Sequence, residues 1–149
     1  MYRTIQLVLA VLLGVSLYII WLLYRPYPMV DIESPVPIFG YKEGYMRGEE
    51  MVFQLTYVKE RNYPGSDINR RIECDDGNLV TMTSFNSNLP LTEEPKMVLS
   101  PPMVIPEKVS DGWCWFVFTE EVPVNHFRME TNEDVSQRFY VLPKEEDEL

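Results

Sequence analysis

The sequence predicts a mainly β protein: an immunoglobulin-like antiparallel β-sandwich of about seven or eight strands, preceded by a single N-terminal transmembrane helix. Three observations support this fold class. An uncharged, apolar run occupies the start of the chain. After it, short stretches alternate between apolar and polar residues, and none has the period of an amphipathic helix. Turn signals recur about every 8 to 12 residues, the spacing expected for a sandwich, with a small barrel as the alternative.

A transmembrane signal-anchor helix is predicted over residues 1–25. Thr4 to Tyr24 contains 21 consecutive residues without a charge. At 1.5 Å per residue this run spans roughly 31 Å, the thickness of the hydrocarbon core of a bilayer. We therefore expect residues 4–24 to lie in the lipid bilayer. The aromatic and basic residues expected at its two interfaces are Tyr2, Arg3, Trp21, Tyr24 and Arg25.

A cleaved signal peptide is the alternative interpretation of this run. Gly14 and Ser16 offer a small-x-small cleavage site, but the apolar stretch continues beyond it through Trp21. A signal peptide ends its apolar stretch before the cleavage site, so an uncleaved anchor is favoured. The very short N-terminal flank favours an amine in the cytosol. We therefore expect the C-terminal domain on the extracytoplasmic side, in the periplasm of a bacterium.

The rest of the chain divides into three predicted parts. Residues 26–40 include four prolines, which favour a stiff, extended stalk between the membrane and the domain. Residues 41–142 contain the predicted strands and form the β-sandwich domain. Residues 143–149 are rich in acidic side chains and form a solvated acidic tail.

Turn residues divide the sandwich domain into its strands. The Asp76-Gly77 pair predicts a tight hairpin, and Pro101-Pro102 predicts short edge strands or a crossing between sheets. Loops are expected at Val122–His126 and at Asn132–Asp134. The predicted strands are residues 51–59, 70–74, 79–85, 97–99, 103–105, 113–119, 127–131 and 138–142.

The charge of the soluble part limits its partners. All 23 acidic residues follow Arg25, whereas 11 of the 13 basic ones do, so this part carries 11 minus 23, or −12. Such a charge repels phosphate groups, which disfavours nucleic acid and anionic lipid headgroups as partners. A basic or neutral protein surface is the expected partner.

Two cysteines, Cys74 and Cys114, lie in the soluble part. Strand alternation lets both face the interior, as the inter-sheet disulfide of immunoglobulin domains does. Closing the loop between them would stabilise the fold by roughly 4 kcal/mol if chain entropy decides. The alternative is two buried free thiols. The tryptophan that immunoglobulin domains carry between these cysteines is absent, which leaves the bridge and the topology open.

Trp113, Trp115 and Val117 share the opposite face of the strand that contains Cys114. If the cysteine face fills the core, the two tryptophans point outward and mark a possible binding patch. The alternative is that they form the core and that loops cover the other face.

No arrangement of residues predicts catalysis. His126 is the single histidine, and no Ser or Cys nucleophile can be placed beside it. Asp75, Asp76 and Asn78 lack the alternating acidic spacing and the distal Glu of a calcium loop, and a tight turn explains them. We therefore expect no enzyme activity, metal, cofactor or small-molecule substrate.

Short patterns spread along the chain resemble one group of proteins. They include Leu89-Pro90, Val104 to Pro106, Asp111-Gly112 before an aromatic strand, and Ser136-x-x-Phe-x-Val at the end. This layout, after an N-terminal anchor and covering most of residues 40–142, resembles the small uncharacterised membrane-anchored β-sandwich proteins encoded by tailed bacteriophages. The resemblance implies a bacterial envelope setting and assigns no functional residues.

Two functional hypotheses follow from the sequence. The first is a non-enzymatic, single-pass membrane-anchored interaction module that displays its sandwich to a protein partner outside the cytoplasm. The second is a lysis-associated or envelope-perturbing membrane factor. Such a factor usually needs an amphipathic or coiled-coil segment, and none is visible in the sequence, so the first hypothesis is favoured.

Overall fold

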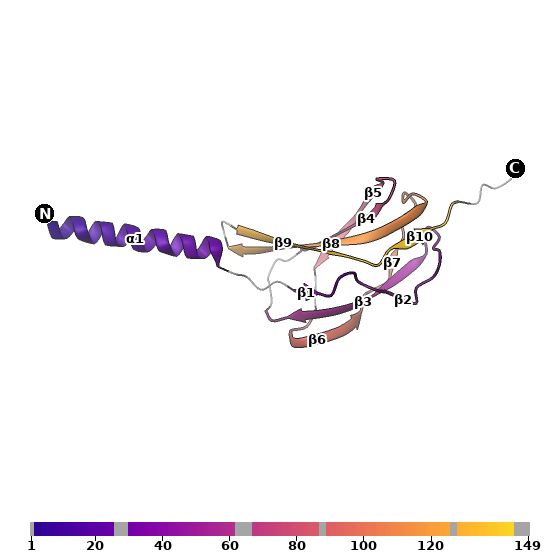
Figure 1. The fold of residues 1–149 in the computed structure, drawn as a ribbon, viewed down its shortest axis with the longest axis horizontal. Helices are drawn as coiled ribbons and strands as arrows, with labels where there is room; N and C mark the ends of the chain where they lie inside the picture. Colours follow the sequence, from indigo (N-terminus) through magenta and orange to yellow (C-terminus); the bar gives the residue numbers. More distant parts are fainter. Residues whose placement is uncertain (1, 26–29, 62–66, 87–88, 126–127, 145–149) are drawn as a thin grey trace.

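One helix and two antiparallel β-sheets make up the computed structural model, which describes residues 2–25, 30–61, 67–86, 89–125 and 128–144. The sheets pack face to face as a β-sandwich, and the helix leaves one end of it (Figure 1). This arrangement confirms the prediction of a mainly β protein, with a β-sandwich preceded by one N-terminal helix.

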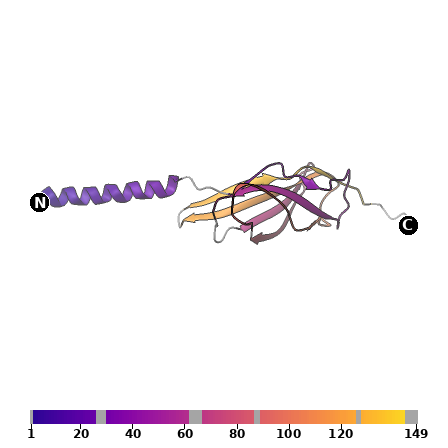
Figure 2. The ribbon, with the colours of Figure 1, turned by 90° about the horizontal axis from the view of Figure 1, so that it is seen from below.

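Helix α1 (Tyr2–Tyr24) is long and apolar enough to cross a membrane. An 18-residue window within it has a mean hydropathy of 2.5, and no residue of the helix is buried against the sandwich. A soluble helix with this composition would be expected to cover its apolar surface with other parts of the chain. The helix instead projects from the sandwich roughly along its long axis (Figure 2).

The first sheet is built around strand β3 (Glu50–Lys59). On one side β3 pairs with β1 (Asp31–Ile32) and, further along, with β2 (Ile38–Phe39). On the other side it pairs with β6 (Thr92–Leu99) and then with β7 (Met103–Val104). Five strands therefore occupy only three positions across the sheet.

The second sheet is built around strand β8 (Gly112–Asn125). Strand β4 (Asp67–Cys74) pairs with one side of β8, and β5 (Leu79–Asn86) lies beyond it. Strands β9 (Arg128–Val135) and β10 (Phe139–Val141) follow each other along the other side of β8. This sheet is therefore four positions wide, and the ten strands together fill seven positions, in line with the seven or eight expected strands.

The segment between β1 and β3 covers the outer edge of β9 and β10. The amide of Val36 donates to the carbonyl of Val135 at 2.8 Å, and the amide of Gln137 donates to the carbonyl of Val36 at 2.7 Å. Further along, Tyr45 forms a parallel bridge with Val141. This edge is therefore closed by the chain itself and is not open to pairing with another protein.

The core lies between β3 and β8, where aromatic rings from the two sheets interlock. Phe53 packs edge-on against Phe116 and Phe118, with ring centroids 5.0 and 5.6 Å apart. Phe116 also packs against Phe139, with ring centroids 5.6 Å apart. Fully buried side chains in the same core cluster include Val36, Met51, Ile72, Ile105, Val109 and Val141.

The predicted stalk is wrong for residues 30–40. Val30, Val36 and Ile38 are buried, and β1 and β2 pair with β3, so the sandwich begins at Val30 and not at residue 41. Prolines on either side of Val36 hid the strand signal, because proline is tolerated at sheet edges while it breaks the apolar alternation. Residues 26–29 of the predicted stalk lie outside the described residues, as do residues 145–149 of the predicted tail.

Both predicted loops near the end of the chain are also wrong where the structure describes them. Residues 122–125 continue β8, and Asn132–Asp134 lies within β9. Polar residues suggested a loop at Asn132–Asp134, but Asn132 and Asp134 alternate with outward residues and are held in a polar part of the interior. His126 lies outside the described residues.

The interlocked aromatic core predicts that two phenylalanines contribute very differently to stability. Replacing buried Phe53 by alanine removes the ring that joins the sheets, so we expect Phe53→Ala to lower the free energy of unfolding by about 3–5 kcal/mol. Phe39→Ala is the control, because Phe39 is 57% exposed on the opposite face of the same sheet, and should cost less than about 1 kcal/mol. Urea titration of the full chain in detergent, followed by tryptophan fluorescence, measures both; equal losses would contradict this packing.

Candidate interaction surfaces

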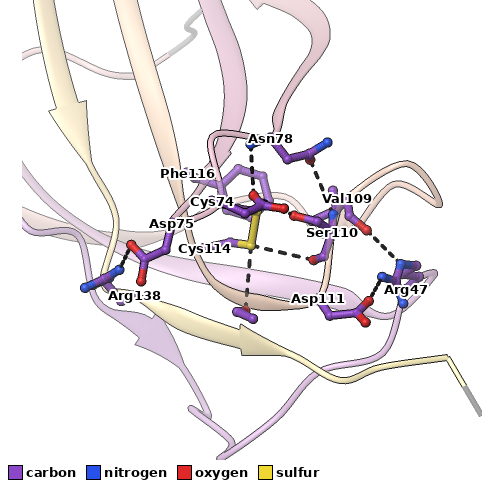
Figure 3. The surroundings of a disulfide bond; sticks show 12 residues. Arg47, Cys74, Asp75, Asn78, Val109, Ser110, Asp111, Cys114, Phe116 and Arg138 are labelled. Carbon is purple, nitrogen blue, oxygen red and sulfur yellow. Dashed lines mark hydrogen bonds and ion pairs between the residues drawn. A yellow bond between two sulfur atoms is a disulfide. The ribbon is translucent and has the colours of Figure 1, made fainter.

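Cys74 and Cys114 form a disulfide in the structure (Figure 3). Both residues are buried, and they lie directly opposite each other on the neighbouring strands β4 and β8. The bond therefore links two strands of one sheet, and the expected bridge between the sheets is wrong. Alternation correctly places both sulfurs inward, but it does not say whether the partner strand lies beside the first strand or across the core.

The loops around the disulfide are held together by charged and polar side chains (Figure 3). The Arg47 guanidinium donates to the carbonyl of Val109 at 2.7 Å and pairs with Asp111. Arg138 pairs with Asp75 across the same end of the sandwich. These contacts join the loop before β3 to the loop before β8, and the β4–β5 turn to the segment before β10.

The hydrogen bonds of the β4–β5 turn explain why acidic residues occur there. Asp76 accepts a hydrogen bond from the amide of Asn78 at 2.9 Å and another from the hydroxyl of Ser110 at 3.0 Å. These bonds hold the pKa of the Asp76 carboxyl below its usual value. Gly77 occupies the left-handed position of the turn, with φ at +85°. Among the described residues no group of three or more His, Cys, Asp or Glu side chains could hold a metal ion.

The position of the disulfide predicts a large effect of reduction on stability. Cys74 and Cys114 are separated by 40 positions in the chain, so opening the bond should lower the free energy of unfolding by roughly 4 kcal/mol through chain entropy. The variant Cys74→Ala/Cys114→Ala should unfold at a lower urea concentration than the oxidised chain. Adding a reductant should shift the midpoint of the wild type and leave that of the double variant unchanged. A wild-type urea midpoint that does not change when the reductant is added would contradict the disulfide.

The predicted patch of Trp113, Trp115 and Val117 does not form one exposed surface. Trp113 is 44% exposed and packs edge-on against Tyr140, with ring centroids 5.4 Å apart. Trp115 is half-buried, with the Arg138 guanidinium 5.2 Å from its ring. Val117 is 1% exposed and therefore offers no surface to a partner. The expectation that all three face a partner is therefore wrong for Val117.

Charged side chains cover the rest of this outer face of the second sheet. Arg71 donates to Glu73 at 2.6 Å and to Glu133 at 3.0 Å, which raises the pKa of its guanidinium. Beside Trp115 lies a shallow groove of about 480 Å³, whose lining includes Pro35, Val135 and Arg138. Most polar groups on this face already have partners within the domain.

A different surface, on the outside of the first sheet, gathers exposed apolar side chains. We call it the apolar face, and it consists of Phe39, Val52, Met97, Leu99 and Val104. The strand register brings them together. Phe39 lies opposite Val52, while Leu99, Met97 and Val104 lie opposite Gln54, Thr56 and Glu50 on the same outward side of β3.

The side chains of the apolar face are unusually exposed to solvent for apolar residues. Phe39, Met97, Leu99 and Val104 are between 47% and 61% exposed, and Val52 between them is half-buried. Scattered apolar residues on a surface are ordinary, but a contiguous group across three neighbouring strand positions makes this face a candidate interaction site. Sequence reasoning missed it because its members come from four strands, and only the register shows that they share one face.

Charged residues are buried at the end of the sandwich nearest the helix. Lys59, Glu120 and Asp134 are each less than 10% exposed. The Lys59 ammonium donates to the carbonyl of Leu89 at 2.9 Å. Burial raises the pKa of Glu120, with Lys59 opposing the rise and Asp134 adding to it. Burial, together with the charge of Asp31, raises the pKa of Asp134 to about 6.

These buried groups are structural. The cavity beside Glu120 and Asp134 measures about 20 Å³, which is enough for no more than a water molecule. Asp134 also accepts a hydrogen bond from the Asn132 amide at 3.3 Å. A raised carboxyl pKa can indicate a catalytic acid or base, but a substrate cannot reach these two carboxyls.

The raised pKa of Asp134 predicts that the stability of the domain depends on pH. Its folded pKa of about 6 lies above the ordinary value of 3.8, so the folded state holds the proton more tightly. The contribution of Asp134 to stability is therefore full below about pH 4 and is lost as pH rises through about 6. We expect Asp134→Asn to raise the free energy of unfolding by roughly 1–3 kcal/mol at pH 7.5 and to change it little at pH 4.

Urea titrations of the wild type and of Asp134→Asn at both pH values measure this difference. The control is Glu93→Gln, which removes an exposed carboxylate of β6 and should leave the stability difference near zero at each pH. A loss of stability in Asp134→Asn at pH 7.5 would show that the ionised carboxylate is the favoured form, contrary to this account.

The predicted membrane-interface residues lie at the two ends of α1. Tyr2 is 84% exposed at the start, next to exposed Arg3. At the other end Trp21 and Tyr24 are 52% and 78% exposed, and the Arg25 guanidinium lies 5.1 Å from the centre of the Trp21 ring. Aromatic rings and cations at both ends of an apolar helix match the interfacial pattern of membrane spans.

Comparison with models of known protein families gave no match, and no curated protein matched the chain in sequence.

Proposed function

We propose that this chain is a non-enzymatic, single-pass membrane protein that displays an immunoglobulin-like sandwich outside the cytoplasm as a protein-binding module. The observation that carries the proposal is the apolar face of the first sheet. A folded domain whose core is already filled by interlocking rings has no need of five further apolar side chains on its surface. Binding of a partner protein supplies the cover that this surface lacks.

Membrane anchoring is supported by helix α1. None of its side chains is buried, and it ends in the aromatic and basic residues typical of an interface. Transfer of this apolar surface from water into lipid is strongly favourable. The disulfide between Cys74 and Cys114 supports an oxidising compartment, and therefore an extracytoplasmic domain.

The order of the strands supports the immunoglobulin-like topology. If the seven strand positions are numbered along the chain, the first sheet has the order 1-2-5 and the second has the order 4-3-6-7. An immunoglobulin constant domain has strands ABED in one sheet and CFG in the other. The present fold differs by moving the fourth strand to the second sheet, where β5 pairs with β4.

Charge decides which protein surface fits the apolar face. The soluble part carries −12 (11 basic minus 23 acidic residues), and Glu50 lies on the same outward side of β3 as Val52. A second copy of this chain would bring two strongly acidic domains together, which electrostatic repulsion opposes. We therefore propose a partner with an apolar patch surrounded by basic residues. The resemblance to phage-encoded envelope proteins supports a bacterial envelope as the setting.

Photo-crosslinking in bacterial cells tests the proposal. A photoreactive amino acid at Leu99, in the apolar face of the full chain, should give a covalent adduct with another protein. The matched control places the same amino acid at Thr81, an exposed position on the outside of the second sheet, and should give none. Val104→Glu alongside the Leu99 probe should abolish the adduct, because it buries a charge in the interface.

Two outcomes would contradict the proposal. An adduct of twice the mass of the chain would identify a second copy as the partner and would contradict the charge argument. Equal adducts from the Leu99 and Thr81 positions would show that the apolar face has no special role.

A further inference from the structure

The hairpin formed by β8 and β9 extends to the end of helix α1 and contacts it (Figure 1). Asn125, the last residue of β8, donates from its side-chain amide to the carbonyl of Leu22 at 3.1 Å. Arg128, the first residue of β9, donates from its guanidinium to the carbonyl of Arg25 at 2.7 Å. Two residues that pair with each other across the hairpin therefore reach the final turn of the helix and the residue after it.

These contacts satisfy groups that a helix end leaves open. The last four carbonyls of an α-helix have no partner within the helix, and each unsatisfied carbonyl is costly near a hydrocarbon layer. The Arg128 guanidinium, which also pairs with Glu130, lies at the negative end of the helix dipole. A third donor, the Asn132 amide, reaches the carbonyl of Val30 at 3.3 Å, so the hairpin also holds the chain where it enters the sandwich.

We propose that the end of β8 and the start of β9, at Asn125 and Arg128, form a membrane-contacting foot that lies among the phospholipid headgroups. This inference rests on the proposed anchoring of α1. If Trp21, Tyr24 and Arg25 lie at the interface, then Asn125 and Arg128 lie at the same depth, because they are within hydrogen-bonding distance of that part of the chain. The Arg25 guanidinium, beside the Trp21 ring, provides a cation for lipid phosphate at this level.

The foot also determines how the sandwich is oriented relative to the membrane. The sandwich continues the direction of the helix, and its opposite end carries the disulfide and the β4–β5 turn (Figures 1 and 2). A hairpin attached to the helix end keeps the strands close to the membrane normal. The apolar face then lies roughly parallel to the membrane normal. It is therefore accessible to the extramembrane part of a neighbouring protein.

Paramagnetic broadening of amide NMR signals tests the foot directly. The full chain is placed in phosphatidylcholine nanodiscs that contain a lipid with gadolinium chelated at its headgroup. We expect loss of the amide signals of Asn125 and Arg128, and no loss for Asp76 and Asn78 at the opposite end. The variant Asn125→Ala/Arg128→Ala should regain the signals at positions 125 and 128, while Asp75→Ala, at the far end, should behave as the wild type.

Three results would overturn the inference, and one control separates it from the proposed anchoring. Unbroadened signals from Asn125 and Arg128, equal broadening at both ends of the sandwich, or unchanged broadening in the double variant would each exclude a foot held by these side chains. Broadening of the helix signals by a lipid with a paramagnetic label in its acyl chain reports anchoring alone. If the helix is broadened and the hairpin is not, the foot fails and the anchoring stands; if neither is broadened, both fail.

Discussion

The packing of Phe53 on β3 against Phe116 and Phe118 on β8 is the interaction on which the rest of the structure depends. It joins the central strands of the two sheets, and every other strand pairs with one of them or, as β5 does, with a neighbour. Because side chains alternate along a strand, filling the core with the odd residues of β3 turns Val52 outward into the apolar face. On β8 the same alternation turns Cys114 inward and Trp113 outward. The proposed binding surface is therefore a consequence of the core.

The outline of this fold could be predicted from local sequence signals. The uncharged run gave the helix its bounds within two residues, the Asp76-Gly77 pair located the β4–β5 turn, and the alternation after Glu50 located β3. These signals are strong because each depends on neighbours in the chain. The two sulfurs were likewise placed inward by alternation alone.

Features that depend on distant parts of the chain could not be predicted in this way. The disulfide joins neighbours in one sheet because β4 lies beside β8, and nothing near Cys74 or Cys114 in the sequence indicates that pairing. Predicting the apolar face would require knowledge of the register of four strands. The predicted Trp113 and Trp115 patch is partly covered because Tyr140 and Arg138 from β10 and its preceding segment pack against it. In each case the missing information was which strands are neighbours in the sheet.

We propose that a bilayer-spanning helix holds a disulfide-bonded sandwich outside the cytoplasm, and thiol labelling separates this arrangement from a cytosolic domain. A Thr81→Cys variant provides a reporter at an exposed position, and intact spheroplasts, from which the outer membrane barrier has been removed, are treated with a membrane-impermeant maleimide attached to polyethylene glycol. We expect one label on intact spheroplasts, with labels at Cys74 and Cys114 added only after the protein is denatured and reduced. A reporter that reacts only after the membrane is broken, with Cys74 and Cys114 labelled without reduction, would place the domain in the cytosol and contradict the account.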